Sequence, residues 1–168
     1  MYIVGINIMY NEVVMSHKKI LRSGIIIESI AKLLIINEKN EALILTIGEY
    51  KAHPEKSYSP DLPGGQVEIG DGETELAGVI REAREEAGII LQANDIFLAY
   101  TRTGKYKKEG TSVSLFLYIA QLNYSPDVLI SWEHASYEWI PIDKVLKTKT
   151  FDMFYQEAIQ YAVETKLL

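Results

Sequence analysis

Residues 31–47 hold two apolar runs separated by a short polar turn, and this pattern limits the fold more than any other in the chain. The sequence AKLLIINEKNEALILTI is rich in residues that favour β-strands, and Glu38, Lys39 and Asn40 interrupt it. The pattern predicts a β-hairpin whose strands are both largely buried. We therefore expect this hairpin in the interior of the domain.

Residues 74–87 have the spacing of an amphipathic helix. Its apolar face is expected to consist of Leu76, Ile80, Ala83 and Ala87. Thr74 stands where an N-terminal cap is needed, and Gly88 stands where a glycine commonly ends a helix. A helix over residues 74–87 is the prediction.

The remaining segments predict further strands and a closing helix. Strands are expected at residues 95–102, 112–122 and 136–141, and a helical turn at residues 142–147. Residues 48–63 contain Gly48 and three prolines, which predicts a long loop. Residues 152–165 predict an amphipathic helix, whose inward face is expected to comprise Phe154, Ala158, Ile159, Ala162 and Val163. Together these elements predict one α+β domain.

Composition excludes several classes of function. A length of 168 residues suits one domain, and 48% hydrophobic with 24% charged residues is typical of a globular protein. The net charge of -6 argues against broad nucleic-acid binding, and no basic helix-turn-helix pattern indicates a DNA-binding module. The absence of cysteine excludes disulfides, thiolate zinc sites and cysteine nucleophiles. This composition suits the reducing cytoplasm.

The first residues form an apolar stretch, MYIVGINIMYNEVV, which has neither a basic start nor a small-residue cleavage site. Asn7, Asn11 and Glu12 interrupt it well short of membrane-spanning length. We interpret residues 1–24 as an N-terminal extension that adds a strand or a homodimer contact. Residues 25–168 are then the main domain.

The predicted helix carries an unusual cluster of acids. On a helical wheel Glu82, Glu85 and Glu86 fall within one narrow face, opposite the apolar stripe. Glu82 and Glu86 repel each other at i,i+4, and both lie near the C-terminal end, where the helix dipole disfavours anions. A solvated charged face is the alternative reading. The turn Leu62-Pro63-Gly64-Gly65 precedes the helix, and such a turn favours a site where carboxylates bind a hard cation that bridges to phosphates.

The same residues resemble the Nudix box, G-x5-E-x7-R-E-U-x-E-E-x-G-U, in which U is aliphatic. Gly65, Glu73, Arg81-Glu82-Ala83, Glu85-Glu86 and Gly88-Ile89 follow that pattern, and from Glu73 onward every spacing matches. The departure is upstream, where Gly65 and Glu73 are separated by seven residues instead of five. The resemblance extends over roughly residues 25–145. It implies an α/β/α sandwich around a mixed β-sheet.

The resemblance also implies roles for individual residues. Glu82, Glu85 and Glu86, with the carbonyl of Gly64, would bind Mg²⁺, with Mn²⁺ as the alternative ion. Glu73 and Arg81 would form a structural ion pair, and Gly65 and Gly88 would shape the two ends of the motif. Glu82 or Glu85 would serve as general base.

Loop residues outside the box are weaker candidates. Glu133 lies six residues before Trp139, where MutT-like proteins carry a metal-binding or catalytic glutamate; an ordinary solvated acid is the equal alternative. The candidates for contact with substrate are Arg102, Lys105, Tyr106 and His134.

The predicted activity is metal-dependent hydrolysis of a pyrophosphate linkage. Nucleoside triphosphates, nucleotide sugars, ADP-ribose and dinucleoside polyphosphates all contain this linkage, and the sequence leaves the choice among them open. The alternative is a non-catalytic Nudix-like domain that binds a ligand or a basic partner. Neither reading involves a membrane.

Overall fold

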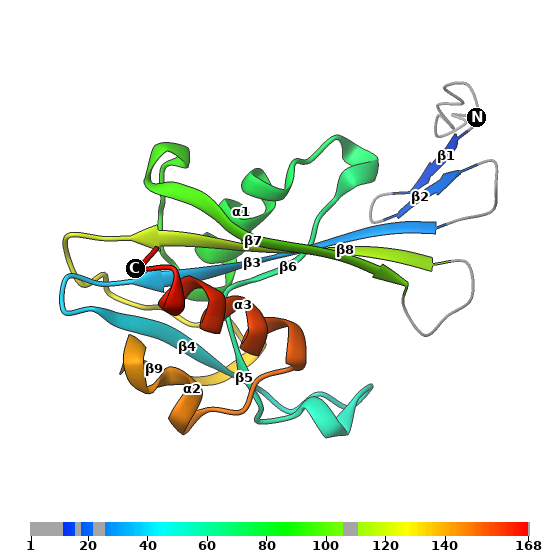
Figure 1. Cartoon of the computed structure of the whole chain (residues 1–168). Coiled ribbons are helices and arrows are strands. Elements are labelled where there is room, and N and C mark those ends of the chain that lie inside the picture. The colour runs from blue at the N-terminus through cyan, green and yellow to red at the C-terminus, as the bar shows by residue number, and fades with distance from the viewer. Residues whose placement is uncertain (1–11, 16–17, 22–25, 106–110, 168) are drawn as a thin grey trace.

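In the computed structural model, which describes residues 12–15, 18–21, 26–105 and 111–167, nine strands form one mixed sheet with helices on both faces (Figure 1). The strands are β1 (Glu12–Met15), β2 (Lys18–Leu21), β3 (Ile26–Ile36), β4 (Glu41–Ile47), β5 (Pro60–Asp61), β6 (Gly64–Gln66), β7 (Ile96–Lys105), β8 (Thr111–Gln121) and β9 (His134–Pro141). The α-helices are α1 (Glu75–Ala87), α2 (Ile142–Thr148) and α3 (Met153–Glu164). None of the helices described is long and apolar enough to cross a membrane.

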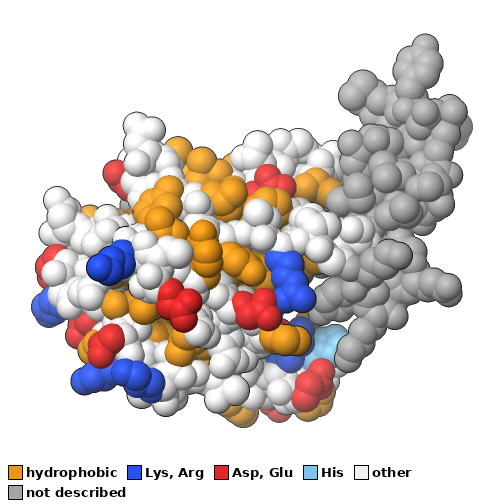
Figure 2. All heavy atoms as spheres, in the orientation of Figure 1, with side chains coloured by type: hydrophobic (Ala, Val, Ile, Leu, Met, Phe, Trp, Pro, Cys, Tyr) orange, Lys and Arg blue, Asp and Glu red, His pale blue; other side chains and the backbone are white. Residues whose placement is uncertain are grey.

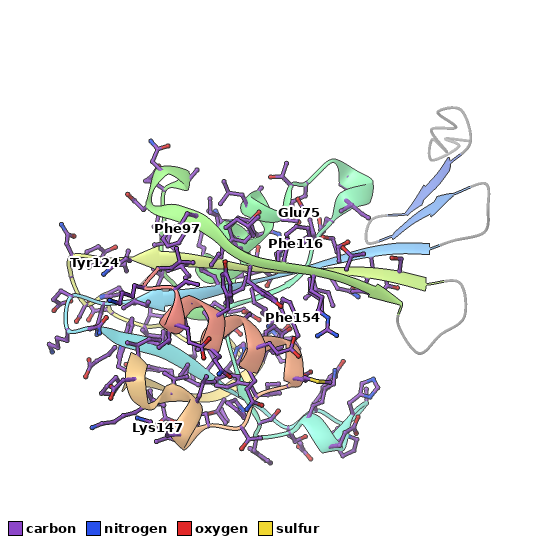
Figure 3. The ribbon with its side chains drawn as sticks, in the orientation of Figure 1. Glu75, Phe97, Phe116, Tyr124, Lys147 and Phe154 are labelled. Atoms are coloured by element: carbon purple, nitrogen blue, oxygen red, sulfur yellow. The ribbon has the colours of Figure 1, made fainter. Side chains whose placement is uncertain are left out.

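From Ala31 to Ile36 in β3 and from Ala42 to Leu45 in β4, side chains alternate between the two faces of the sheet. The face toward α1 buries Ala31, Leu33, Ile35, Leu43 and Leu45 together with Val79, Ala83 and Ala87. The face toward α2 and α3 buries Leu34, Ile36, Ala42 and Ile44 together with Val145, Phe154, Ala158 and Ile159. Figure 3 shows Phe116, which packs on the α1 side, and Phe154, which packs on the other. Because both faces are covered, Leu33–Ile36 of β3 and Ala42–Leu45 of β4 are continuously apolar, and the predicted α/β/α sandwich is confirmed.

The central strand β3 changes partners along its length. On one side it pairs in parallel with all of β8. On the other side it pairs with β4 only at Ile36 and Ala42, and further along with β6, where Lys32 lies opposite Gly64. The two hairpin strands therefore diverge. Residues 60–66 lie between them, pairing first with β4 at Asp61 and then with β3.

The predicted hairpin and first helix are confirmed. Asn37 holds the turn, because its side-chain oxygen accepts hydrogen bonds from the backbone N–H groups of Lys39 and Glu41. Thr74 caps α1 by accepting a hydrogen bond from the N–H of Ala77, and Gly88 ends it in the left-handed conformation.

One detail of the predicted packing is wrong. Val163 is 39% exposed and not inward, because the inward face of α3 is already filled by the residues at 154, 158, 159 and 162. The predicted loop at 48–63 contains a 3-10 turn, η1 (Pro54–Lys56), and the two-residue strand β5.

The N-terminal hairpin extends the sheet. β1 pairs with β2, and β2 pairs with the beginning of β3 (Figure 1). Residues 1–11 of the predicted extension lie outside the described residues. The boundary near residue 24 and the homodimer contact stay predictions.

Gly64 meets β3 too closely for any side chain. A Cβ atom there would lie 2.3 Å from the carbonyl oxygen of Ala31, and its φ is +130°. We expect Gly64→Ala to lower the free energy of unfolding in urea by roughly 3 kcal/mol or more, because backbone must move. Gly72→Ala is the matched control, since Gly72 has φ +83° and nothing within 4 Å of its Cβ position. It should cost only about 1 kcal/mol. Equal losses in the two variants would contradict the packing described for Gly64.

Candidate active site

Arg81 is the centre of an ion-pair network between α1 and the loop before it. Its Nε donates to Oε1 of Glu73 at 2.9 Å, and one terminal nitrogen donates to Glu82 at 2.7 Å and to Glu85 at 3.2 Å. The other terminal nitrogen donates to Glu73 and to the carbonyl of Gln66. The hydrogen bonds that Arg81 donates to Glu73 lower the pKa of Glu73, and the same hydrogen bonds raise the pKa of Arg81.

The two additional residues before Glu73 are accommodated without loss of this ion pair. A 3-10 turn, η2 (Ile69–Asp71), takes up the extra length and ends at Gly72 in the left-handed conformation. The turn is closed where the N–H of Glu68 donates to Oε2 of Glu73 at 2.8 Å. The ion pair that the sequence resemblance implies between Glu73 and Arg81 is therefore present.

Glu86 differs from the other acids of the helix because it is buried. The prediction that it lies with Glu82 and Glu85 on one narrow face opposite the apolar stripe is wrong: Glu86 is 7% exposed, whereas the side chain of Glu85 is 51% exposed. The reason is helical geometry, since Glu86 follows the fully buried Val79 by seven residues and so lies on nearly the same face. Its Oε2 accepts a hydrogen bond from the N–H of Gly64 at 2.8 Å.

Lys32 and Asp61 form a buried ion pair that sequence reasoning missed. Nζ of Lys32 lies 2.8 Å from Oδ2 of Asp61 and donates a second hydrogen bond to the carbonyl of Leu62 at 2.9 Å. Burial opposes the charge of Lys32, but Asp61, Tyr155 and Glu86 together outweigh it and hold the pKa of Lys32 above its ordinary value. The available signal was a single lysine within the apolar run of β3.

A cavity of about 450 Å³ opens beside these groups. Its lining residues are Lys32, Ile47, Gly48, Glu49, Tyr50, Lys56, Asp61, Gly65, Glu86, Trp132, Glu133 and His134. The cavity therefore lies among β3, β5, β6 and α1, the end of β4 with the loop that follows it, and the start of β9 with the segment before it. Of the aromatic residues on its wall, Trp132 is 89% exposed and Tyr50 is 44% exposed.

A family model for the NUDIX domain matches residues 28–161. The chain belongs to the NUDIX family. The family prediction is therefore confirmed, and with it the class of enzyme: a pyrophosphohydrolase, which is a hydrolase acting on acid anhydrides.

Individual relatives agree with this family assignment. An asymmetrical bis(5'-nucleosyl)-tetraphosphatase of Caenorhabditis elegans is 31% identical over 96 residues, which cover 57% of this chain and 67% of that protein. The mouse protein of the same name is 27% identical over 90 residues, which cover 53% of this chain and 60% of that protein. Thus the match spans about two thirds or less of these relatives. The structure of the MutT protein from Methanosarcina mazei Go1 has a TM-score of 0.68 and 27% identity, covering 83% of this chain and 96% of that one.

Residues 129–134, which lead into β9, connect α1 to the cavity. The N–H groups of Leu129 and Ser131 donate to the carbonyls of Ala87 and Glu86, which satisfies the C-terminal end of α1. His134 is buried, and its Nε2 lies 3.9 Å from Oε1 of Glu86. Burial lowers the pKa of His134. Both His134 and the exposed Glu133 thus reach the same cavity as Glu86.

The structure separates Arg102 from this part of the NUDIX fold. The guanidinium of Arg102 on β7 pairs with Glu157 of α3 at 2.7 Å. Figure 2 shows that charged side chains are scattered among apolar ones on the face of the molecule turned to the viewer. Arg102 is absent from the described residues that line the cavity. The side chain of Lys105 and the whole of Tyr106 lie outside the described residues. Substrate contact by these three residues stays a prediction.

The carboxylates of Glu82, Glu85 and Glu86 on α1 are of the chemical type that binds a hard cation. NUDIX hydrolases generally use a divalent metal, and carboxylate oxygens are what magnesium and manganese prefer. Oxygens of Glu82 and Glu85 already converge on one positively charged nitrogen of Arg81. Among the described residues, however, no three acidic or histidine side chains yet surround a single point. Two of the acids are instead directed to Arg81.

Burial raises the pKa of Glu86 from 4.5 to about 7, although Lys32 acts in the opposite direction. The folded protein thus binds the proton of the Glu86 carboxyl group more tightly than the unfolded chain does. The resulting stability is fully present below pH 4.5 and is lost as the pH rises through 7. We compare the free energy of unfolding of Glu86→Gln with that of the wild type in EDTA. The difference, variant minus wild type, should rise by about 2 kcal/mol from pH 5 to pH 8.

Urea denaturation at the two pH values measures that difference. Glutamine keeps an oxygen acceptor for Gly64 and cannot ionise, and the other titrating groups are common to both proteins. A gap between the two proteins that is the same at both pH values contradicts the assignment.

Proposed function

We propose that this NUDIX protein hydrolyses the pyrophosphate linkage of a nucleotide with the help of Mg²⁺ or Mn²⁺. In this proposal Glu82, Glu85 and Glu86 bind the cation together with the carbonyl of Gly64. The observation that carries it is the hydrogen bond from Gly64 to the buried Glu86, because it brings one box acid, the turn and the cavity together. Glu82 lies against the same turn, since a Cβ on Gly65 would be 3.1 Å from its Oε1.

We further propose a bis(5'-nucleosyl)-tetraphosphate as the substrate. The support is the relationship to proteins that carry the name of asymmetrical tetraphosphatases. An asymmetrical cut of four phosphates leaves a nucleoside triphosphate and a nucleoside monophosphate. The cavity has polar and charged groups at Lys32 and Glu86 and exposed aromatic rings at Trp132 and Tyr50, which suits a molecule with a phosphate chain and a base.

The residues of the chain would divide the chemistry among them. When bound, the cation would supply charge neutralisation of the phosphates and a polarised water. Glu82, Glu85 or Glu133 would accept the proton of the attacking water. Arg81 would hold Glu82 and Glu85 in place until they turn to the cation, and Glu73 would keep Arg81 fixed. Glu86 would lose its proton on binding.

The first test is Glu85→Gln. Because Glu85 is half exposed and its neutral analogue has the same shape, the fold should be unaffected while kcat falls by roughly a hundredfold or more. Hydrolysis of diadenosine tetraphosphate with Mg²⁺ and Mn²⁺, followed by separation of the products, measures this. Glu75→Gln, in the first turn of the same helix, is the matched control and should retain wild-type turnover. Near-normal turnover of Glu85→Gln at saturating metal contradicts the metal-site proposal.

The second test concerns the aromatic rings. Stacking of a base on Trp132 would contribute about 1–3 kcal/mol, so Trp132→Ala should raise KM for diadenosine tetraphosphate by roughly ten- to hundredfold with little change in kcat. Leu129→Ala is the control, because Leu129 is 74% exposed in the same segment and is not part of the cavity lining. An unchanged KM for Trp132→Ala removes the stacking role from this residue.

A further inference from the structure

Lys32 is a buried cation on the wall of the cavity. It is 7% exposed, and its ammonium is held by Asp61 and by the carbonyl of Leu62. An ammonium has three N–H donors, and these two partners engage two of them. Lys32 thus presents a fixed positive charge next to space that a ligand can enter.

Stability alone is a poor reason for this charge. A lysine on β3 interrupts a strand whose neighbouring side chains are otherwise apolar, and it must be desolvated. Replacing a buried ion pair by apolar groups of similar size is often neutral or stabilising. Burying the ammonium of Lys32 opposite Gly64 therefore costs stability, which favours a functional reason for the lysine.

The charges around the cavity indicate what that reason is. Four acids line it, Glu49, Asp61, Glu86 and Glu133, against two lysines. A phosphate chain entering such a cavity requires cations. Lys56 is exposed on η1, whereas Lys32 is buried and held by two hydrogen bonds, so binding through Lys32 requires little ordering of the side chain.

The backbone places Lys32 beside the box acids. Lys32 pairs with Gly64, whose N–H donates to Glu86, and the next residue, Gly65, lies against the carboxylate of Glu82. Lys32, Glu86 and Gly65 all line the same cavity. A phosphate chain bound next to Glu82 and Glu86 would therefore lie close to Lys32.

We propose that the ammonium of Lys32 binds a non-bridging oxygen of the substrate's phosphate chain, with Asp61 as the residue that positions it. This inference rests on the proposed function, because it assumes that a phosphate chain enters this cavity. Removal of Lys32 should weaken the binding of phosphate chains and leave the ion pairs of Glu82 and Glu85 with Arg81 unaltered.

Binding of imidodiphosphate, a non-hydrolysable pyrophosphate analogue, tests this by calorimetry with saturating Mg²⁺. Lys32→Met should weaken binding by roughly 10- to 100-fold, the effect of losing one charged hydrogen bond. Because Lys32→Met leaves Asp61 buried without its cation, the double variant Lys32→Met/Asp61→Asn is measured too. It should recover the melting temperature and still bind weakly. Lys39→Met, on the exposed turn between β3 and β4, is the charge-matched control and should bind like the wild type.

Asp61→Asn separates a functional from a structural role. It removes a negative charge and keeps Lys32, so it should weaken binding far less than Lys32→Met does. Weakening equal to that of Lys32→Met shows that only the intact pair matters, and it overturns the inference.

Wild-type affinity in the double variant also overturns the inference. The proposed function still stands in that case if the wild type hydrolyses dinucleoside tetraphosphates and Glu85→Gln does not. A wild type that does not bind imidodiphosphate overturns the inference as well, and the hydrolysis assay then decides the proposed function separately.

Discussion

The N–H of Gly64 donates to Oε2 of Glu86 across 2.8 Å, and this hydrogen bond joins the sheet to the helix at the point where β3 and β4 diverge. The acceptor is buried, and the donor Gly64 lies directly against β3, which its lack of a side chain permits. Residues 60–66 are then held between the two hairpin strands. The positions of Lys32, Asp61 and the cavity wall all follow from this arrangement.

Arg81 and Lys32 balance acids of this region. Arg81 pairs with Glu73 in the loop before α1 and with Glu82 and Glu85 on α1, and Lys32 pairs with Asp61 at the wall of the cavity. Glu86 lies between these groups, where burial favours its protonated form. This explains how the chain can place like charges on one helix against the helix dipole and still fold. In our proposal a divalent cation would take over part of the neutralisation that Arg81 provides.

The sequence was sufficient for the layers of the fold and for the local structure of α1. Continuous apolar runs predicted a sheet covered on both faces, and Thr74 and Gly88 marked the helix ends, because both signals are local. The burial of Glu86 was not foreseen, since a helical wheel centred on Leu76 and Ile80 places the stripe away from Val79, which tertiary packing selects. The pairing of Lys32 with Asp61 joins residues far apart in the chain, and no spacing rule reports such contacts. The Glu73–Arg81 pair was expected only through the family pattern, and η2 shows how the longer loop preserves it.

The central claim is that the acids of α1 bind a divalent cation next to the cavity. Titration of the wild type with Mn²⁺, followed by the electron paramagnetic resonance signal of the free ion, tests it most directly when the same titration is made with Glu82→Gln/Glu85→Gln. Our account predicts that the wild type removes Mn²⁺ from solution and that the double variant removes markedly less, with both proteins equally folded by circular dichroism. Equal uptake by the two proteins would place the cation elsewhere and contradict the account.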